Sequence, residues 1–303
     1  MRIFENFDYQ FIDGRVKGYI FSSVLILLSI GSFFVNGLEM GIDFRGGREF
    51  VIETTSQLDV TAVRGALSTV LESDPEVKTY DSGSKLLVRT TGVQDVTIVQ
   101  NQILSTIESE FEGSNPIVDK TYVVSPRFAE DLKQGAIYSV LGSLLVIFVY
   151  ILLRFEWRFG VGAVVALFHD VTITLGVFSI LRGMLGFSLQ IDQTIIAAFL
   201  TIVGYSLNDT VVVFDRVREY SGLFKSDSYA HVVNKSINNT LSRTIITSGT
   251  TLFVVSVLFI FGGDVLRGFA FALIIGIVIG TYSSIFVASP VVLELRNRSA
   301  KKR

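Results

Sequence analysis

An aspartate stands inside an apolar segment that is long enough to cross a membrane. Residues 191–216 read IDQTIIAAFLTIVGYSLNDTVVVFDR, and a bilayer-spanning helix needs roughly 20 such residues. Asp209 lies on the order of 9 Å, at 1.5 Å per helical residue, before the charged end at Asp215 and Arg216. An ionised carboxylate in a membrane helix costs roughly 2.5–3.5 kcal/mol. We therefore expect Asp209 to be protonated, paired, or in contact with a water-filled path.

Polar residues accompany Asp209 along the same segment. At helical spacing one face is shared by four of them: Thr194, Thr201, Tyr205 and Asn208. Tyr205 precedes Asp209 by about one turn. An acid beside such a stripe favours a proton or ion relay, and the alternative is a protonated acid that hydrogen-bonds a neighbouring helix.

A second charged group begins the next apolar segment. Arg243 stands in NNTLSRTIITSGTTLF, and three threonines continue its polar face inward: Thr247, Thr250 and Thr251. One segment leaves the membrane where the next returns, so Arg243 and Asp209 lie toward the same membrane surface. Near Arg243 the Asp209 carboxylate is favoured as the anion, and away from it burial favours the protonated acid. The alternative is that Arg243 anchors the helix by reaching the lipid headgroups.

Two further titratable residues, His169 and Asp170, stand near the middle of another apolar segment. Neighbouring residues of a helix point about 100° apart, so we expect that they do not both face one small site directly. Asp170 is placed to join a polar network with Thr174 one turn on, and His169 titrates near neutral pH where water reaches it. The alternative, which we favour, is a static hydrogen-bonded pair that fixes helix packing.

The last apolar segment carries a small residue at every fourth position. The seam consists of Gly268, Ala272, Gly276 and Gly280, followed by Ser284 and Ala288. Small residues at this spacing allow two helix backbones to approach closely in a membrane. We assign this seam to helix packing and not to chemistry.

Composition excludes several classes of protein. Half of the 303 residues are hydrophobic, and the mean hydropathy is +0.54, which is too apolar for an ordinary soluble domain. A net charge of −2 gives no general basic field for nucleic acid. The chain has no cysteine and two distant histidines, so neither a thiolate nor a histidine-rich metal site is expected. No nucleotide-binding or nucleophile motif occurs, and we predict no enzyme activity, no cofactor and no metal.

The order of apolar and polar stretches predicts a membrane α-helical bundle with six transmembrane helices. The spans are expected at about 18–35, 135–153, 160–181, 191–214, 244–261 and 268–293, with a long polar loop at 215–243 that contains a solvated His231. We read 1–35 as the N-terminus and first span, retained as an anchor, and 135–303 as the remaining bundle and tail.

Residues 36–134, between the first two spans, have the composition of a soluble domain. GIDFRGG at 41–47 is expected to form a tight joint, followed by strands near 49–55, 76–80, 85–90 and 117–124 and helices over 59–72 and 94–111. The order β-α-β-β-α-β is that of an α+β ferredoxin-like unit. Lys and Arg gather at the termini and at 154–159 and 215–243, so both termini should be cytoplasmic and this domain extracytoplasmic.

Several motifs, in order along the chain, resemble the SecF family, the smaller half of the bacterial SecDF protein-export complex within the resistance-nodulation-division superfamily. They are GIDFRGG at 41–47, FEWR at 155–158, ALFHDVTITLG at 166–176, VGYSLNDTVVVFDRVRE at 203–219, RTIITSGTTL at 243–252, FGGDVLRGFA at 261–270 and IGTYSSIFVASP at 279–290. The resemblance implies six spans, the external domain, and a proton pathway through Asp209 and Arg243.

The resemblance further implies a role in protein translocation across the cytoplasmic (inner) membrane, driven by the proton motive force with protons as the coupling ion. The implied partners are a SecD-like subunit that supplies a further intramembrane acid, a SecYEG-type translocon, YajC, an unfolded preprotein and the lipid bilayer, with no nucleic acid. Two other functions stay open: a non-transporting membrane scaffold for the export machinery, and a small-molecule efflux half-transporter.

Overall fold

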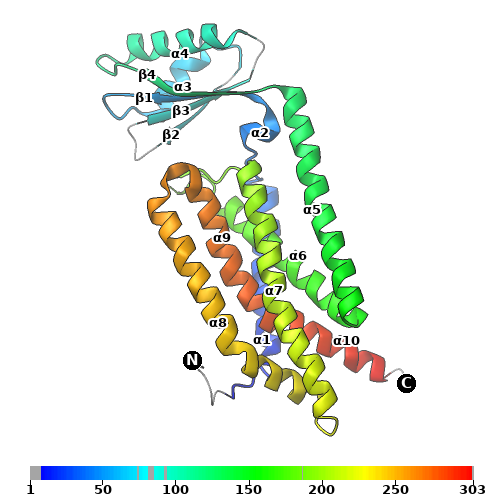
Figure 1. The fold of residues 1–303 in the computed structure, drawn as a ribbon. Helices are drawn as coiled ribbons and strands as arrows, with labels where there is room; N and C mark the ends of the chain where they lie inside the picture. Colours follow the sequence, from blue (N-terminus) through cyan, green and yellow to red (C-terminus); the bar gives the residue numbers. More distant parts are fainter. Residues whose placement is uncertain (1–7, 74, 81–84, 92–93, 186, 302–303) are drawn as a thin grey trace. The chain divides into compact units, whose positions relative to one another are not determined.

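The computed structural model describes residues 8–73, 75–80, 85–91, 94–185 and 187–301. The chain divides into two compact units (Figure 1). The helix unit comprises Met1–Leu38, Tyr138–Arg182 and Thr194–Arg303, and the sheet unit comprises Glu39–Ile137 and Gly183–Gln193. The second part of the sheet unit is a connection between two membrane helices, which no pattern in the sequence assigns to the soluble domain.

Six helices of the described chain are long and apolar enough to span a membrane, as the sequence predicts. Five are single α-helices: α1 (Arg15–Val35), α5 (Pro126–Arg154), α6 (Trp157–Ile180), α7 (Gln193–Leu223) and α8 (Tyr229–Phe261). The sixth span, Leu266–Ser299, is built from α9 (Gly263–Ser283), a π-helical turn (Ser284–Ala288) and α10 (Ser289–Lys301). The chain is a multi-pass membrane protein.

The predicted polar loop at 215–243 is wrong. The helices α7 and α8 extend through most of it, and only 224–228 connect them. Ser228 begins α8 as its N-cap, with its hydroxyl accepting from the His231 backbone N–H at 3.3 Å. His231 is therefore an exposed residue in the first turn of a helix rather than part of a loop. The charged residues of this stretch lie on helix faces beyond the apolar segments, and hydropathy alone does not distinguish such faces from a loop.

The small-residue seam of α9 lies against α7. A Cβ atom added at Gly280 would lie 3.0 Å from the Ser206 Cβ, and one added at Gly276 would overlap the Ile202 side chain. Of the other seam residues, Ala272 is fully buried and Gly268 is buried as well. The seam brings α9 close to the part of α7 that leads to Asp209.

Gly276→Ala should destabilise the helix unit by about 1–3 kcal/mol, because the added methyl group overpacks the contact with Ile202. Gly204→Ala is a matched control: it makes the same change on α7, where nothing lies within 4 Å of the added Cβ. There we expect no loss, since alanine favours a helix over glycine by about 1 kcal/mol. Thermal unfolding of both variants in detergent measures the difference, and equal midpoints would contradict the close packing.

The sheet unit has four antiparallel strands in the order β2-β3-β1-β4. Their bounds are β1 Gly47–Glu53, β2 Glu76–Tyr80, β3 Lys85–Thr90 and β4 Ile117–Val124, and three helices accompany them: α2 (Ile42–Arg45), α3 (Val60–Ser68) and α4 (Val96–Glu110). The predicted order of strands and helices is confirmed. Asp59 and Asp95 cap α3 and α4 by accepting from backbone N–H groups of the first turn.

The core of the sheet unit lies between the sheet and its two longer helices, which cover the same face (Figure 1). Phe50 and Ile52 of β1 point into it, and so do Leu67 of α3 and Ile103 of α4, all less than 2 % exposed. Alternation along β1 places Glu49 and Val51 on the opposite face of the sheet. That face carries charged residues that contact Gln190 and Glu39, as described below.

The GIDFRGG motif forms the predicted joint between α1 and the sheet. Its first residues make α2, and Gly46 and Gly47 then turn the chain with φ of 71° and 125°. At Gly47 a Cβ would lie 2.8 Å from the Thr90 carbonyl oxygen. Only glycine tolerates both the positive φ and the close approach, which accounts for the pair of glycines.

Candidate functional site

Asp209 lies on the buried face of α7, inside the helix unit. Asp209 is 3 % exposed, and its Oδ2 accepts a hydrogen bond from the Ser248 hydroxyl of α8 at 3.2 Å. The Ser248 hydroxyl is in turn 2.8 Å from the Thr281 hydroxyl of α9. The carboxyl group is thus surrounded by neutral hydroxyl groups from two other helices, an environment in which the protonated and ionised forms compete.

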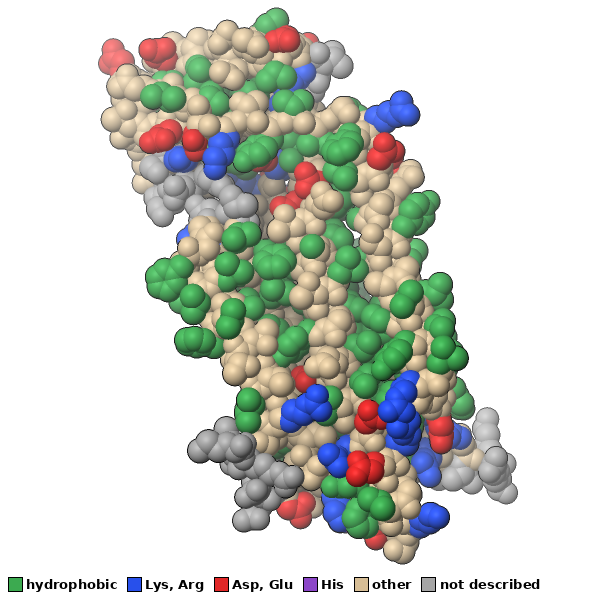
Figure 2. Space-filling model, viewed as in Figure 1, with side chains coloured by type: hydrophobic (Ala, Val, Ile, Leu, Met, Phe, Trp, Pro, Cys, Tyr) green, Lys and Arg blue, Asp and Glu red, His purple; other side chains and the backbone are tan. Residues whose placement is uncertain are grey.

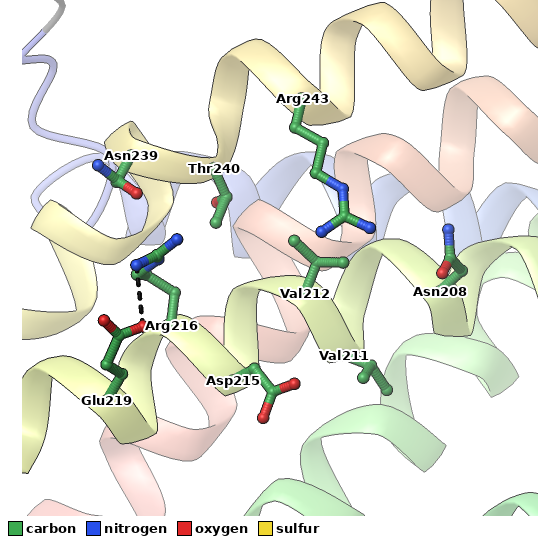
Figure 3. A pocket seen from close by; sticks show the side chains of 9 residues that line it. All are labelled: Asn208, Val211, Val212, Asp215, Arg216, Glu219, Asn239, Thr240 and Arg243. Carbon is green, nitrogen blue, oxygen red and sulfur yellow. Dashed lines mark hydrogen bonds and ion pairs between the residues drawn. The ribbon is translucent and has the colours of Figure 1, made fainter.

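Arg243 lies on α8, five residues before Ser248, and is exposed. Its guanidinium group extends toward α7 and lies near Val212 and Asn208 (Figure 3). In the described part of the chain, no hydrogen bond or ion pair joins it to Asp209, but its charge is within electrostatic range of that carboxyl group. The two predicted relay residues are therefore brought near each other without being locked together.

A cavity of about 420 Å³ opens beside Arg243, between α7 and α8 (Figure 3). Its lining is Asn208, Val211, Val212, Asp215, Arg216, Glu219, Asn239, Thr240 and Arg243. Arg216 is paired with Glu219 at 2.8 Å. The cavity connects Arg243 with the charged end of α7 and α8, so solvent can reach Arg243 from that end.

Two hydroxyl groups of α7 close to Asp209 are buried without a hydrogen-bond partner among the described residues: Tyr205 Oη and Thr210 Oγ1. Tyr205 stands one turn before Asp209, and Thr210 follows it directly. A buried hydroxyl without a partner loses on the order of 1–3 kcal/mol. Polar groups of this kind are usually satisfied by water.

The predicted polar stripe does not share the face of Asp209. Its outer members Thr194, Thr201 and Asn208 are exposed on α7. On α8, Thr250 is exposed as well, and Thr247, Thr250 and Thr251 each donate to a carbonyl of their own helix. The residue of α8 that contacts Asp209 is Ser248, the neighbour of Thr247.

His169 and Asp170 form a second buried network. The His169 Nδ1 and Asp170 Oδ1 atoms are 2.9 Å apart, and Asp170 Oδ2 accepts from Ser206 of α7 at 2.5 Å and Ser283 of α9 at 2.8 Å. His169 Nε2 lies 3.0 Å from the Ser22 hydroxyl of α1. The two side chains form the hydrogen-bonded pair that we favour from the sequence, although neighbouring residues of a helix point about 100° apart.

This second network joins four helices. It begins at Asp170, which is 0 % exposed, and ends at Tyr282, whose hydroxyl is 3.1 Å from Ser22 and donates to the Gly18 carbonyl at 2.8 Å. Thr174 donates to the Asp170 backbone carbonyl and not to its carboxylate. Among the described residues, no group of three or more His, Asp or Glu side chains could hold a metal ion.

Two family models match the chain. Residues 103–298 match the family described as "Protein export membrane protein SecD/SecF, C-terminal", and residues 31–57 match the "SecD/SecF GG Motif". The chain is 66% identical to the Protein translocase subunit SecF of Rhodothermus marinus, over 100% of this chain and 98% of the relative. The chain belongs to the SecF family. Its SecF relative from Vibrio alginolyticus is 42% identical over 91% of this chain and 86% of its own.

A solved structure has the same fold. The crystal structure of SecDF from Thermus thermophilus, described as a translocon-associated membrane protein, is 35% identical, with a TM-score of 0.85 over 96% of this chain. A second one, SecDF in a super-membrane-facing form, gives 34% identity and a TM-score of 0.72 over 98%. This SecF-family chain spans 39% of the first structure's chain and 40% of the second's. Membership of a family of translocase subunits assigns it a role in protein translocation and not in enzyme catalysis.

Sequence reasoning missed the serines and threonines that contact the two acids. These are Ser206 and Ser248, Thr281 and Ser283. Ser206 precedes Asp209 by three residues, so it lies on the same face of α7, which was a usable signal. On α9 and α8 the small hydroxyl residues are indistinguishable from packing residues until the neighbouring helix is known.

Proposed function

We propose that this chain is a subunit of an accessory complex that uses the proton motive force to promote protein translocation across the cytoplasmic membrane. Asp209 is the group that carries the proton, and Arg243 biases its charge. The observation that carries this proposal is the environment of Asp209: a buried carboxyl group in a membrane helix, hydrogen-bonded to a neutral hydroxyl, with the Arg243 guanidinium in electrostatic range and, among the described residues, not bonded to it. Ionisable residues in such positions are functional sites by default.

The relay works as a two-state switch. Movement of α8 toward α7 brings the Arg243 guanidinium closer to Asp209 and favours the carboxylate, and movement away favours the protonated acid. A proton that crosses the membrane releases roughly 2.3 kcal/mol per 100 mV. That energy shifts an equilibrium between two arrangements by roughly 50-fold.

The second network has a positioning role in this proposal. Asp170 is fully buried, and its carboxylate is saturated by His169, Ser206 and Ser283. Buried polar networks in which every member is bonded fix one arrangement of the surrounding helices. The pair of His169 and Asp170 therefore holds α6, α7 and α9 together beside the relay.

Both termini are proposed to be cytoplasmic. Arg15, at the start of α1, forms an ion pair with Glu294 of α10 at 3.1 Å, so the first and last spans meet at the same end of the helix unit. Tyr9 and Ile12 donate their backbone N–H groups to Asn238 and Asn234 near the start of α8. Lys and Arg side chains gather over this end, and hydrophobic side chains cover the middle of the helices (Figure 2). Such an asymmetry marks the cytoplasmic side.

The proposal of a SecD-like partner rests on the share of the solved SecDF chains that this chain matches. The solved relatives are SecDF chains of which this chain spans about two fifths, so a SecD-like subunit supplies the remainder. The exposed polar faces of α7 and α8 are suited to a protein neighbour, because exposed hydroxyls and an arginine are unfavourable in lipid. A SecYEG-type translocon, YajC and an unfolded preprotein are the further proposed partners.

The experiment that tests the function is export of a preprotein into inverted membrane vesicles that contain the assembled complex. Export that depends on this complex should fall at least tenfold when an ionophore collapses the proton gradient while ATP is kept constant. A scaffold predicts no change with the ionophore, and an efflux half-transporter predicts accumulation of small molecules in a deletion strain with normal export. Either result would contradict the proposal.

A further inference from the structure

Charged residues on the face of the sheet that α3 and α4 do not cover, here the open face, contact the connection between α6 and α7. Arg89 of β3 is 5 % exposed; its guanidinium group binds Glu49 of β1 and Glu76 of β2, the latter at 3.4 Å. The same guanidinium group donates to the side-chain oxygen of Gln190 at 2.5 Å. The strand pairing places Glu49 and Glu76 directly opposite Arg89 on its two sides. The register of the sheet therefore fixes the positions of these three charged residues.

Gln190 also holds the segment that follows α1. Its side-chain nitrogen donates to Glu39, whose carboxylate is bound by Lys78 of β2 as well. Burial acts to raise the pKa of Glu39, but the Lys78 and Gln190 hydrogen bonds outweigh it and hold the pKa at about 2. Glu39 is therefore ionised across the physiological range, and the contact is permanent rather than pH-controlled.

Backbone pairing reinforces this junction. Met40 and Ile191 form a parallel bridge, with hydrogen bonds from Ile191 N–H to the Glu39 carbonyl at 2.7 Å and from Gly41 N–H to the Ile191 carbonyl at 2.8 Å. Two residues later the Gln193 N–H, the first of α7, donates to the Asp43 carboxylate at 3.0 Å. All of these residues belong to the sheet unit.

The helix that starts at this junction carries the relay. From Gln193, α7 is one continuous helix to Leu223, and Asp209 follows Gln193 by 16 positions, about 24 Å along the axis. A helix transmits displacement and rotation of its first turn along its length, since its backbone bonds resist bending. The sheet unit, through Gln193, and the acid therefore lie on one continuous helix.

We infer that Gln190 is a positioning residue for the proton relay: by joining Arg89 and Glu39 it fixes Gln193, the first residue of α7, within the sheet unit, so that rearrangement of that unit and protonation at Asp209 are coupled. This inference rests on the proposed function. The role assigned to the junction is to hold the start of α7, and it does not take part in binding the proton.

The test begins with Gln190→Ala in the full chain, assembled with its partners. Proton-driven export should fall at least fivefold while the amount of assembled complex is unchanged. Lys85→Gln is the matched control: it also removes a polar partner from the open face of β3, but from a surface pair with Asp119 at 2.8 Å. Export in the control should stay within twofold of the parent chain.

A rescue experiment separates positioning from stability. The chain has no cysteine, so a Met40→Cys/Ile191→Cys pair can be added alone; paired strands lie about 4.8 Å apart, within the ~4.4–6.8 Å Cα separation of disulfides. In the Gln190→Ala background, oxidation should restore export and reduction should remove it. A Glu53→Cys/Lys85→Cys pair, which crosslinks directly opposed residues of β1 and β3, should stabilise the sheet unit without restoring export.

Two results would overturn the inference: normal export in Gln190→Ala, or equal rescue by the two disulfides, which would show that only the stability of the sheet unit matters. The same assay on Asp209→Asn tells this failure from that of the proposed function. Loss of export in Asp209→Asn with normal export in Gln190→Ala rejects the joint alone, and normal export in Asp209→Asn rejects the relay itself.

Discussion

Asp209→Asn should reduce proton-driven export at least tenfold and leave assembly intact. Asparagine has the size of aspartate and its amide oxygen can still accept from Ser248, so the contacts among α7, α8 and α9 remain. It cannot bind or release a proton, and the roughly 2.3 kcal/mol per 100 mV of the membrane potential is no longer coupled to movement. Export rate and the yield of the purified complex are the two measurements.

The control for this substitution is Asp227→Asn, the same chemical change in the short connection between α7 and α8. Asp227 lies at the exposed end of these helices, 3.7 Å from His231, and surface pairs contribute at most about 1 kcal/mol. Export should stay within twofold of the parent. Full proton-coupled export in Asp209→Asn would show that the acid is a packing residue or that the chain is a scaffold.

Arg243→Gln should have the second largest effect, a loss of proton-driven export of at least tenfold, because the positive charge that favours the Asp209 carboxylate is lost. Arg243→Lys should retain part of the activity, since it keeps the charge and loses the planar guanidinium. Arg218→Gln is the control: this arginine lies on α7, pairs with Asp215 at 3.1 Å and does not line the cavity.

A different pattern of results would identify Arg243 as a membrane anchor. If Arg243 only reaches the lipid headgroups, lysine should replace it fully, and glutamine should reduce the amount of inserted protein rather than the export per complex. Equal export per complex in Arg243→Gln and Arg218→Gln would therefore remove Arg243 from the relay. Quantifying the inserted chain beside the export rate distinguishes the two roles.

Hydropathy and periodicity were sufficient for the spans and for the strands and helices of the sheet unit, but not for its second part, Gly183–Gln193. The six spans and the order of the strands and helices in the soluble region depend on local patterns of apolar and polar residues, and the structure confirms both. Asp209 could be recognised because a charged residue inside an apolar segment is costly wherever it lies.

What could not be predicted depends on neighbouring helices. Spacing shows which residues share a face, but not whether that face points inward, so Thr201 and Asn208 were expected beside the acid and are exposed instead. The contact of Ser248 with Asp209, and that of Gln190 with Arg89, join residues 39 and 101 positions apart. No local pattern reports such pairs, because only the packed structure brings them together.

The central claim is that Asp209 exchanges protons, and difference infrared spectroscopy of the assembled complex measures it directly. As the pH is changed, the parent chain should gain and lose a protonated carboxyl band that Asp209→Asn lacks, while Asp227→Asn keeps it. Identical difference spectra for the parent and Asp209→Asn at every pH would contradict the account, because the buried acid would then hold one charge state throughout.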